Sequence, residues 1–244
     1  MSGLPRAILF DLDDTLLRAY GRADLAWAKV TAELGAQLAP FEPADVAAAI
    51  QSHASEFWAD PERHRYWRQR LYESRREVVR GAFAALPGAS HRLRDEVAVR
   101  VADRFSALRD EEMSLFPDAC DTLDSLRARG VTLGLVTNGA AEPQRAKLLR
   151  FDLARRFDHI QIEGEHGFGK PEERAYRHAL ESLGVGAPEA WMVGDNLEWE
   201  VAAPQRLGIH AIWYDGEGRG LPAAAAVRPD RIIRALAELV PGSD

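Results

Sequence analysis

The stretch from Ile8 to Leu16 constrains the fold more than any other part of this sequence, because a short apolar run ends there in closely spaced carboxylates. Residues 7–10 are apolar without interruption, which is typical of a strand buried on both faces. Alternate side chains of an extended chain point the same way, so Asp11 and Asp13 can converge on one point beyond that strand. They could hold a hard cation such as Mg²⁺, and Asp11 could also attack phosphorus directly. The alternative is an Asp-rich turn, since Asp and Thr are common turn residues.

Three later segments repeat this order of an apolar run followed by polar residues. They are Thr137-Asn138-Gly139 after residues 131–136, Lys170-Pro171 after a short glycine-rich run, and Gly194-Asp195-Asn196 after residues 190–193. A hydroxyl, main-chain N–H groups and an ammonium charge all suit the oxygens of a phosphoryl group in transfer. The repeated pattern favours phosphate chemistry over a turn of no function.

Together the four segments resemble the ordered motifs of haloacid dehalogenase-superfamily hydrolases. The residues that carry the resemblance are Asp11-Leu12-Asp13-Asp14-Thr15, Thr137-Asn138-Gly139, Lys170-Pro171, and Gly194-Asp195-Asn196 with Glu200 beyond. The match spans nearly the whole chain, and four motifs in the family's order form a more specific signal than any one of them. The resemblance implies an α/β fold, with a Rossmann-like parallel sheet, helices on both of its faces and an inserted helical cap.

The resemblance also implies a role for each acidic residue. Asp11 matches the family's nucleophile, and Asp13 matches its general acid and base, with the main-chain carbonyl of Asp13 also on the metal. Asp195 matches the acidic metal ligand of the last motif. Asp11, Asp13 and Asp195 are therefore expected to hold Mg²⁺, although Mn²⁺ would fit the same oxygen ligands.

The remaining motif residues are expected to bind phosphate or to support the ligands. Thr137, Asn138 and Lys170 match the phosphate-binding positions, and Lys170 is also expected to take part in catalysis by softening the repulsion between carboxylates and phosphate. Thr15, Asn196 and Glu200 are expected to contact and orient these ligand side chains without binding the substrate themselves. Glu200 would orient either metal-bound water or Lys170. The sequence departs from the family here, because Trp199-Glu200 replaces the common Asn-Asp pair.

The second carboxylate of the first motif separates reactions within the superfamily. A phosphatase needs an acid to protonate the leaving alkoxide, whereas expulsion of halide needs none. True haloacid dehalogenases lack this residue and use no metal, so Asp13 favours a Mg²⁺-dependent phosphatase that forms an aspartyl-phosphate. Two alternatives stay open: a sugar-phosphate phosphotransferase or mutase with the same nucleophile, and a metabolite-binding or regulatory module that has lost catalysis.

Composition limits the partners of the chain. Its 244 residues carry a net charge of −7, so there is no electrostatic footprint for nucleic acid or an anionic membrane. A small phosphorylated metabolite is the expected partner, bound by a monomer or a homodimer. The single Cys120 excludes an internal disulfide and is expected to be a buried small apolar residue. Because the N-terminus shows no signal-peptide pattern, the expected location is cytoplasmic.

Two kinds of periodicity predict the domain organisation. Residues 17–113 show helical spacing, for example Val97, Val101, Phe105 and Leu108, and predict a helical bundle. Residues 114–244 alternate helix and strand, which is typical of a parallel sheet. The predicted strands are 7–10, 131–136, 160–162, 190–193 and 209–213, and a final helix is predicted near 231–239. We therefore expect an α/β core of residues 1–16 and 114–244 and a helical cap of residues 17–113.

The predicted cap contains a basic and aromatic patch around residues 63–70. Arg65, Trp67 and Arg68 are candidates for contacting an anionic substrate. The alternative is a solvated helix face whose arginines pair with nearby glutamates.

Overall fold

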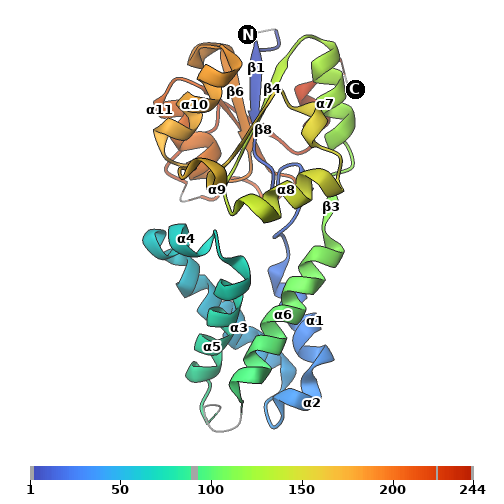
Figure 1. Cartoon of the computed structure of the whole chain (residues 1–244), viewed down its shortest axis with the longest axis vertical. Coiled ribbons are helices and arrows are strands. Elements are labelled where there is room, and N and C mark those ends of the chain that lie inside the picture. The colour runs from blue at the N-terminus through green and yellow to red at the C-terminus, as the bar shows by residue number, and fades with distance from the viewer. Residues whose placement is uncertain (1–2, 89–92, 224, 243–244) are drawn as a thin grey trace. The chain divides into compact units, whose positions relative to one another are not determined.

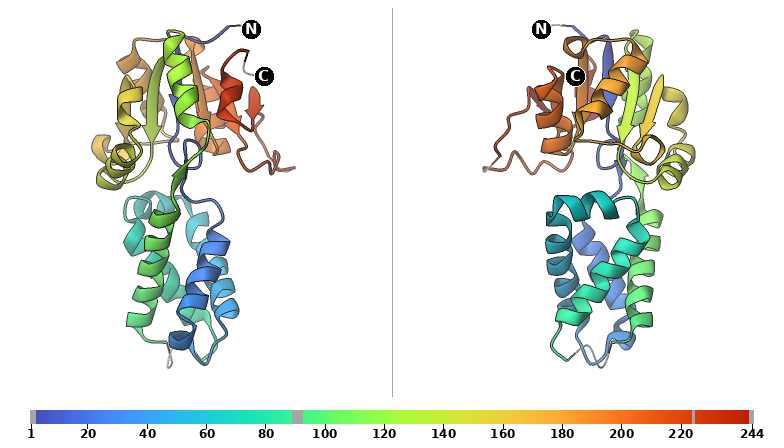
Figure 2. Two further views of the ribbon diagram at one scale, coloured as in Figure 1. Left: turned by 90° about the vertical axis from the view of Figure 1, so that its right-hand side faces the viewer. Right: turned by 60° about the vertical axis from the view of Figure 1, so that its left-hand side comes forward.

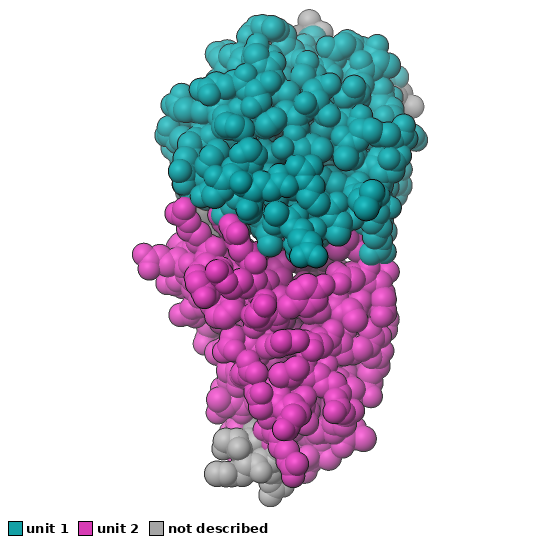
Figure 3. All heavy atoms as spheres, in the orientation of Figure 1, with its two compact units in different colours: residues 1–18, 114–244 teal, residues 19–113 magenta. Residues whose placement is uncertain are grey.

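The computed structural model describes residues 3–88, 93–223 and 225–242. The chain divides into two compact units, residues 1–18 with 114–244 and residues 19–113, which Figure 3 colours separately. The sequence predicts a boundary after residue 16, but the structure keeps two more residues in the first unit. Strand β2 (Leu17–Arg18) pairs antiparallel with β3 (Ser114–Leu115), and this pairing joins the two segments that connect the first unit to residues 19–113.

Within the described residues, the first unit contains a six-stranded sheet in the order β5-β4-β1-β6-β7-β8, with every neighbouring pair parallel (Figure 1). The strands are β1 (Ala7–Phe10), β4 (Thr132–Thr137), β5 (His159–Ile162), β6 (Ala190–Gly194), β7 (His210–Tyr214) and β8 (Arg231–Ile233). The predicted α/β fold is confirmed. The unbroken apolar run of β1 is fully buried because this strand lies inside the sheet between β4 and β6.

The predicted final helix near residues 231–239 is wrong. Its first residues form β8, which pairs with β7, and a 3₁₀ helix follows at Leu236–Leu239. Ile233 is buried while Ile232 is 44% exposed, which is the two-residue alternation of an edge strand. Three residues are too few for that alternation to be separated from a helical pattern in the sequence.

Helices cover both faces of this sheet. Helix α10 (Glu173–Leu183) buries Tyr176 and Ala179 against β1, β4 and β6, and α7 (Ala119–Ala128) lies on the opposite face (Figure 2). The other helices are α8 (Ala141–Arg150), α9 (Glu163–His166), α11 (Ala203–Arg206), a π-helix at Leu197–Ala202, and 3₁₀ turns at Ala154–Arg156 and Ala187–Glu189.

Cys120 is half-buried rather than buried as predicted. It is the second residue of α7, whose buried positions include Ala119, Leu123 and Leu126. Cys120 falls at the border of that apolar stripe, so part of its side chain reaches the surface.

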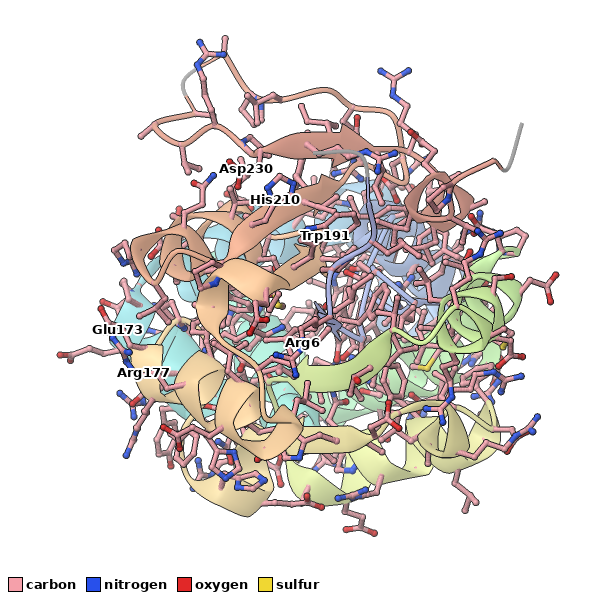
Figure 4. All side chains as sticks on the ribbon, turned by 90° about the horizontal axis from the view of Figure 1, so that it is seen from above. Arg6, Glu173, Arg177, Trp191, His210 and Asp230 are labelled. Carbon is pink, nitrogen blue, oxygen red and sulfur yellow. The ribbon has the colours of Figure 1, made fainter. Side chains whose placement is uncertain are left out.

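The amino-terminal edge of the sheet carries surface pairs, and Figure 4 labels Arg6, Trp191, His210 and Asp230 there. Arg6 Nη1 lies 2.9 Å from Oε1 of Glu189. The rings of Trp191 and His210 have centroids 5.5 Å apart, and His210 Nδ1 lies 3.8 Å from Asp230 Oδ2. The motif residues follow the strands, at the opposite edge.

The described part of the second unit is helical, as its periodicity predicts. Its helices are α1 (Ala23–Glu33), α2 (Gly35–Leu38), α3 (Pro43–Ala59), α4 (Pro61–Trp67), α5 (Leu71–Ala85) and α6 (Asp95–Glu112). Trp27 stacks on Phe105 with ring centroids 3.6 Å apart, inside one apolar core. Among the described residues of both units, no helix has the length and apolar character needed to cross a bilayer.

Candidate active site

Three predicted motif segments begin where neighbouring strands end. Asp11 follows β1, Thr137 is the last residue of β4, and Asp195 follows β6. Strand β1 lies between β4 and β6, and the N–H of Asp11 donates to the carbonyl of Val193 at 3.0 Å. The register therefore places these segments side by side at the carboxyl edge, where open parallel sheets bind ligands.

Lys170 lies between two carboxylates and is fully buried. Its Nζ is 2.5 Å from Oδ1 of Asp11 and 2.7 Å from Oε1 of Glu200, and its side chain is 0% exposed. A buried ammonium group requires such partners, because removing a charge from water is costly. Burial acts to lower the pKa of Lys170, but Asp11 and Glu200 outweigh it and raise the pKa. The lysine is therefore charged at neutral pH.

Asn138 fixes the main chain at Lys170. Its Nδ2 donates to the carbonyl of Lys170, and its Oδ1 accepts the Lys170 N–H, both at 2.8 Å. The adjacent Gly139 N–H donates to Oε2 of Glu163 at 3.0 Å. The structure thus places the Asn138 side chain, predicted to bind phosphate, on the segment that carries Lys170.

Asp11 is buried, with 7% of its surface exposed. The hydroxyl of Thr15, predicted to support the ligands, donates to its Oδ2 at 3.3 Å. Burial raises the pKa of Asp11, and Lys170 opposes this effect. The carboxylate therefore depends on its lysine partner to stay charged.

Asp195 is half-buried next to other carboxylates. Burial raises its pKa well above the usual range, and the charges of Glu200 and Asp11 raise it further. The indole Nε1 of Trp213 donates to the main-chain carbonyl of Asp195 at 2.6 Å, which fixes the turn after β6. Asp11, Glu200 and Asp195 thus bring more negative charge to this edge of the sheet than Lys170 offsets.

This donor set fits a hard divalent cation. Mg²⁺ takes one or two carboxylates and completes its shell with waters and phosphate oxygens, so the carboxylates of Asp11 and Asp195 and the carbonyl of Asp13 would suffice. A cluster of three or more His, Cys, Asp or Glu side chains able to hold a metal does not occur in the described part of the chain. An added cation would offset the repulsion that raises the pKa of Asp195.

Glu200 contacts Lys170, which is one of the two roles considered for it. Its second oxygen, Oε2, accepts the N–H of Asn196 at 2.8 Å. Asn196 in turn caps the π-helix by accepting the N–H of Trp199 at 3.1 Å, and the Trp199 carbonyl accepts the hydroxyl of Tyr176. Trp199 therefore takes part in this turn through its main chain, and its presence does not displace Glu200 from the lysine.

Two residues that sequence reasoning did not identify as functional contact Asp13. Lys147 Nζ lies 2.7 Å from both carboxylate oxygens, and Gln144 Nε2 lies 3.0 Å from Oδ2. Gln144 Nε2 also lies 2.6 Å from the hydroxyl of Thr137. Both residues are buried on α8. A signal was present in the sequence, because two polar residues three positions apart share a helix face with the apolar Leu148.

The three candidates in the helical unit lie on or directly after α4. Arg65 is exposed, whereas Arg68 is 9% exposed and buried. Trp67 is partly buried and packs on the apolar core of this unit, with its ring centroid 5.9 Å from that of Phe57. The patch is therefore divided, with one arginine in solvent and the tryptophan engaged in packing.

The fold and the carboxyl-edge residues define a hydrolase of the haloacid dehalogenase superfamily, and the chain belongs to this family. The model of the haloacid dehalogenase-like hydrolases matches residues 5–208. That range contains all four motifs, together with Gln144 and Lys147.

Two proteins with similar sequences are named as phosphatases. The chain is 34% identical to a phosphoserine phosphatase of Thermus thermophilus, over 96% of this chain and 97% of that protein. It is 31% identical to a ribulose-1,5-bisphosphate 5-phosphatase of Halopiger xanaduensis, over 86% and 84% respectively. A crystal structure of a phosphatase of this superfamily from Thermococcus onnurineus has a TM-score of 0.64 at 25% identity, and the match covers 96% of this chain and 95% of that one.

Proposed function

We propose that this hydrolase is a Mg²⁺-dependent phosphatase that acts on a small phosphorylated metabolite. The observation that carries the proposal is the buried Lys170, paired with Asp11 and Glu200 at the carboxyl edge of the sheet. This arrangement brings a nucleophile and a fixed positive charge together, as transfer of an anionic phosphoryl group requires. The phosphatase names of the relatives support the same reaction.

In the proposed reaction Asp11 attacks phosphorus and forms an aspartyl-phosphate, while the protonated carboxyl of Asp13 gives its proton to the leaving alkoxide. Asp13 then takes a proton from water, which attacks the same phosphorus and releases phosphate and the free Asp11 carboxylate. Lys170 and Thr137 hold the equatorial phosphoryl oxygens. Bound Mg²⁺, held by Asp11, Asp195 and the carbonyl of Asp13, would neutralise charge on the phosphoryl group.

The test is phosphate release from a panel of phosphate esters, with Mg²⁺ and then with EDTA. The panel includes phosphoserine, ribulose-1,5-bisphosphate, other sugar phosphates, nucleoside monophosphates and phosphoglycolate. We expect release that depends on the metal and is concentrated on few of these compounds. Transfer of the phosphoryl group to a second sugar hydroxyl would indicate the mutase alternative. Absence of both reactions in folded protein would favour the non-catalytic module.

Replacing the predicted metal ligand should change the metal requirement. With Asp195→Asn we expect the Mg²⁺ concentration for half-maximal activity to rise by at least about tenfold, because a neutral amide is a weaker ligand than a carboxylate. Titration calorimetry with Mg²⁺ provides a second readout that does not depend on turnover. Glu198→Gln is the matched control, since Glu198 pairs with Arg206 at the surface. An unchanged metal requirement in Asp195→Asn would remove this residue from the metal site.

The cap candidates should affect choice among substrates. If Arg65 or Arg68 contacts the substrate, replacement by Ala should change the ratio of kcat/KM between two phosphate esters by about tenfold. Activity on p-nitrophenyl phosphate should stay nearly constant. Arg76→Ala is the control, because Arg76 pairs with Asp103 within this unit. Equal losses on all esters would instead indicate that these arginines lie on a solvated helix face and do not contact the substrate.

A further inference from the structure

The carboxylate of Asp13 is held by one helix. Lys147 Nζ contacts both of its oxygens at 2.7 Å, and Gln144 Nε2 contacts Oδ2 at 3.0 Å. Among the residues that the structure describes, these two side chains account for all hydrogen bonds to the carboxylate. The Lys147 and Asp13 side chains are only 10% and 14% exposed, so water competes little for this ion pair.

The same helix also contacts the predicted phosphate-binding segment. Gln144 Nε2 lies 2.6 Å from Thr137 Oγ1 and 3.0 Å from the carbonyl of Asn138. One amide group therefore links the first motif to the second. A shift of α8 would move the acid and base and the phosphate-binding hydroxyl together.

The main chain of Asp13 is fixed independently of α8. Asp13 forms a bridge with Leu17, and the N–H of Asp14 donates to the carbonyl of Leu17 at 2.6 Å. The turn therefore sets where the side chain of Asp13 starts, and the contacts from α8 set which way its carboxyl points.

We propose that Gln144 and Lys147 are positioning residues that orient the Asp13 carboxyl for proton transfer to and from the reacting oxygens. The inference rests on the proposed phosphatase function. Proton transfer requires the donor and acceptor atoms to approach within about 2.6–3.2 Å, and a misplacement of about 1 Å can cost on the order of 100-fold in rate. Attack by Asp11 on phosphorus does not require Lys147, whereas Gln144 also contacts the hydroxyl of Thr137, which is proposed to bind the phosphoryl group.

Because Asp13 and Asp11 have separate roles, the loss of kcat/KM in a variant that misplaces Asp13 should depend on the leaving group. Gln144→Met should lower kcat/KM on both esters, because Gln144 also contacts the Thr137 hydroxyl, so Lys147→Met is the diagnostic variant. We compare Lys147→Met with the wild type on the best alkyl ester of the panel and on p-nitrophenyl phosphate. Because an alkoxide must be protonated to leave, kcat/KM on the alkyl ester should fall by about 100-fold. Because p-nitrophenolate leaves without a proton, kcat/KM on the aryl ester should stay within about threefold of the wild type.

A second readout concerns the base function of Asp13. Hydrolysis of the aspartyl-phosphate uses Asp13 on either substrate, so this step should become rate-limiting in Lys147→Met. Rapid mixing with p-nitrophenyl phosphate should then give a burst of p-nitrophenolate close to one equivalent of enzyme, followed by slow turnover. General damage to the site would lower the burst itself.

Three reference variants make the result specific. Asp13→Asn should show the same leaving-group pattern, and Lys147→Arg should recover part of the alkyl activity because it keeps a charged donor. Arg145→Met removes a cation from the same helix, where Arg145 pairs with Glu165 and is 48% exposed, and it should behave as the wild type. Melting temperatures show which variants fold. If Lys147→Met does not fold, Lys147→Gln is measured in its place, and the same leaving-group pattern is expected.

The inference is overturned if Lys147→Met lowers kcat/KM on both esters equally, or on neither, while Asp13→Asn shows the leaving-group pattern. An equal loss would assign Lys147 to phosphoryl binding or to folding. A wild-type protein that hydrolyses neither ester would instead overturn the proposed function. These two failures are therefore distinguishable in one set of assays.

Discussion

Asp11→Asn should lower phosphate release by at least about 10³-fold, because the amide cannot act as the nucleophile. The variant should stay folded, since Asn has the shape of Asp and Lys170 keeps its contact with Glu200 at 2.7 Å. Acid quenching after mixing with ³²P-labelled substrate should trap labelled protein from the wild type and none from the variant.

The control for this experiment is Asp152→Asn. Asp152 is 66% exposed and pairs with Arg155 at the surface, and its replacement should leave activity unchanged. Full activity in Asp11→Asn, with melting showing a folded protein, would refute the nucleophile assignment.

Lys170→Met should remove both activity and much of the stability. The change leaves Asp11 and Glu200 buried without their cation, and breaking a buried pair costs about 3–5 kcal/mol. Loss of phosphoryl charge stabilisation should reduce kcat by about 10²–10³-fold. Thermal unfolding and the rate on the best ester of the panel measure the two effects separately.

The stability loss in Lys170→Met should depend on pH in a defined direction. Burial already raises the pKa of both carboxyls in the native chain, and removal of the lysine raises them further. A carboxyl whose pKa is higher in the folded state adds stability below its unfolded value, and this stability is lost as the pH rises through the folded value. The variant should therefore melt at a higher temperature near pH 5 than near pH 8.

The matched control for Lys170→Met is Lys29→Met. Lys29 is 54% exposed and pairs with Glu112 at 2.9 Å, and a surface pair contributes about 1 kcal/mol or less. Similar destabilisation and a similar pH profile in the two variants would contradict the importance assigned to burial at Lys170.

Those parts of the fold that follow from local patterns were predictable from the sequence. The uninterrupted apolar runs of β1, β4 and β6 indicated buried parallel strands, and the polar residues after them indicated one edge. Strand β8 was missed because its three residues are too few to show a period. The half-exposed side chain of Cys120 depends on its angular position on α7, which composition does not determine.

The candidate-site residues that directly follow strands were predictable from the sequence. Those that reach the site from helix α8 were not. The motif order identified Asp11, Asp13, Lys170 and Asp195 directly. The contact of Lys147 with Asp13 joins residues far apart in the sequence, and it exists only once α8 packs beside the first turn. Likewise, the sequence did not show that the Asn138 side chain hydrogen-bonds to the main chain of Lys170. These two bonds depend on the conformation of two loops, which the spacing of residues in the sequence does not determine.

The short pairing of β2 with β3 has a consequence for how this family can change. Arg18 and Ser114 are partners in that pairing, so residues 19–113 leave the first unit and return to it at neighbouring points. An insertion whose ends are held together in this way resembles a domain grafted into a surface loop, which folds tolerate well. The helical unit can therefore be lengthened, trimmed or exchanged for another by recombination without disturbing the register of the sheet. Such an exchange would leave the residues at the carboxyl edge of the sheet in place.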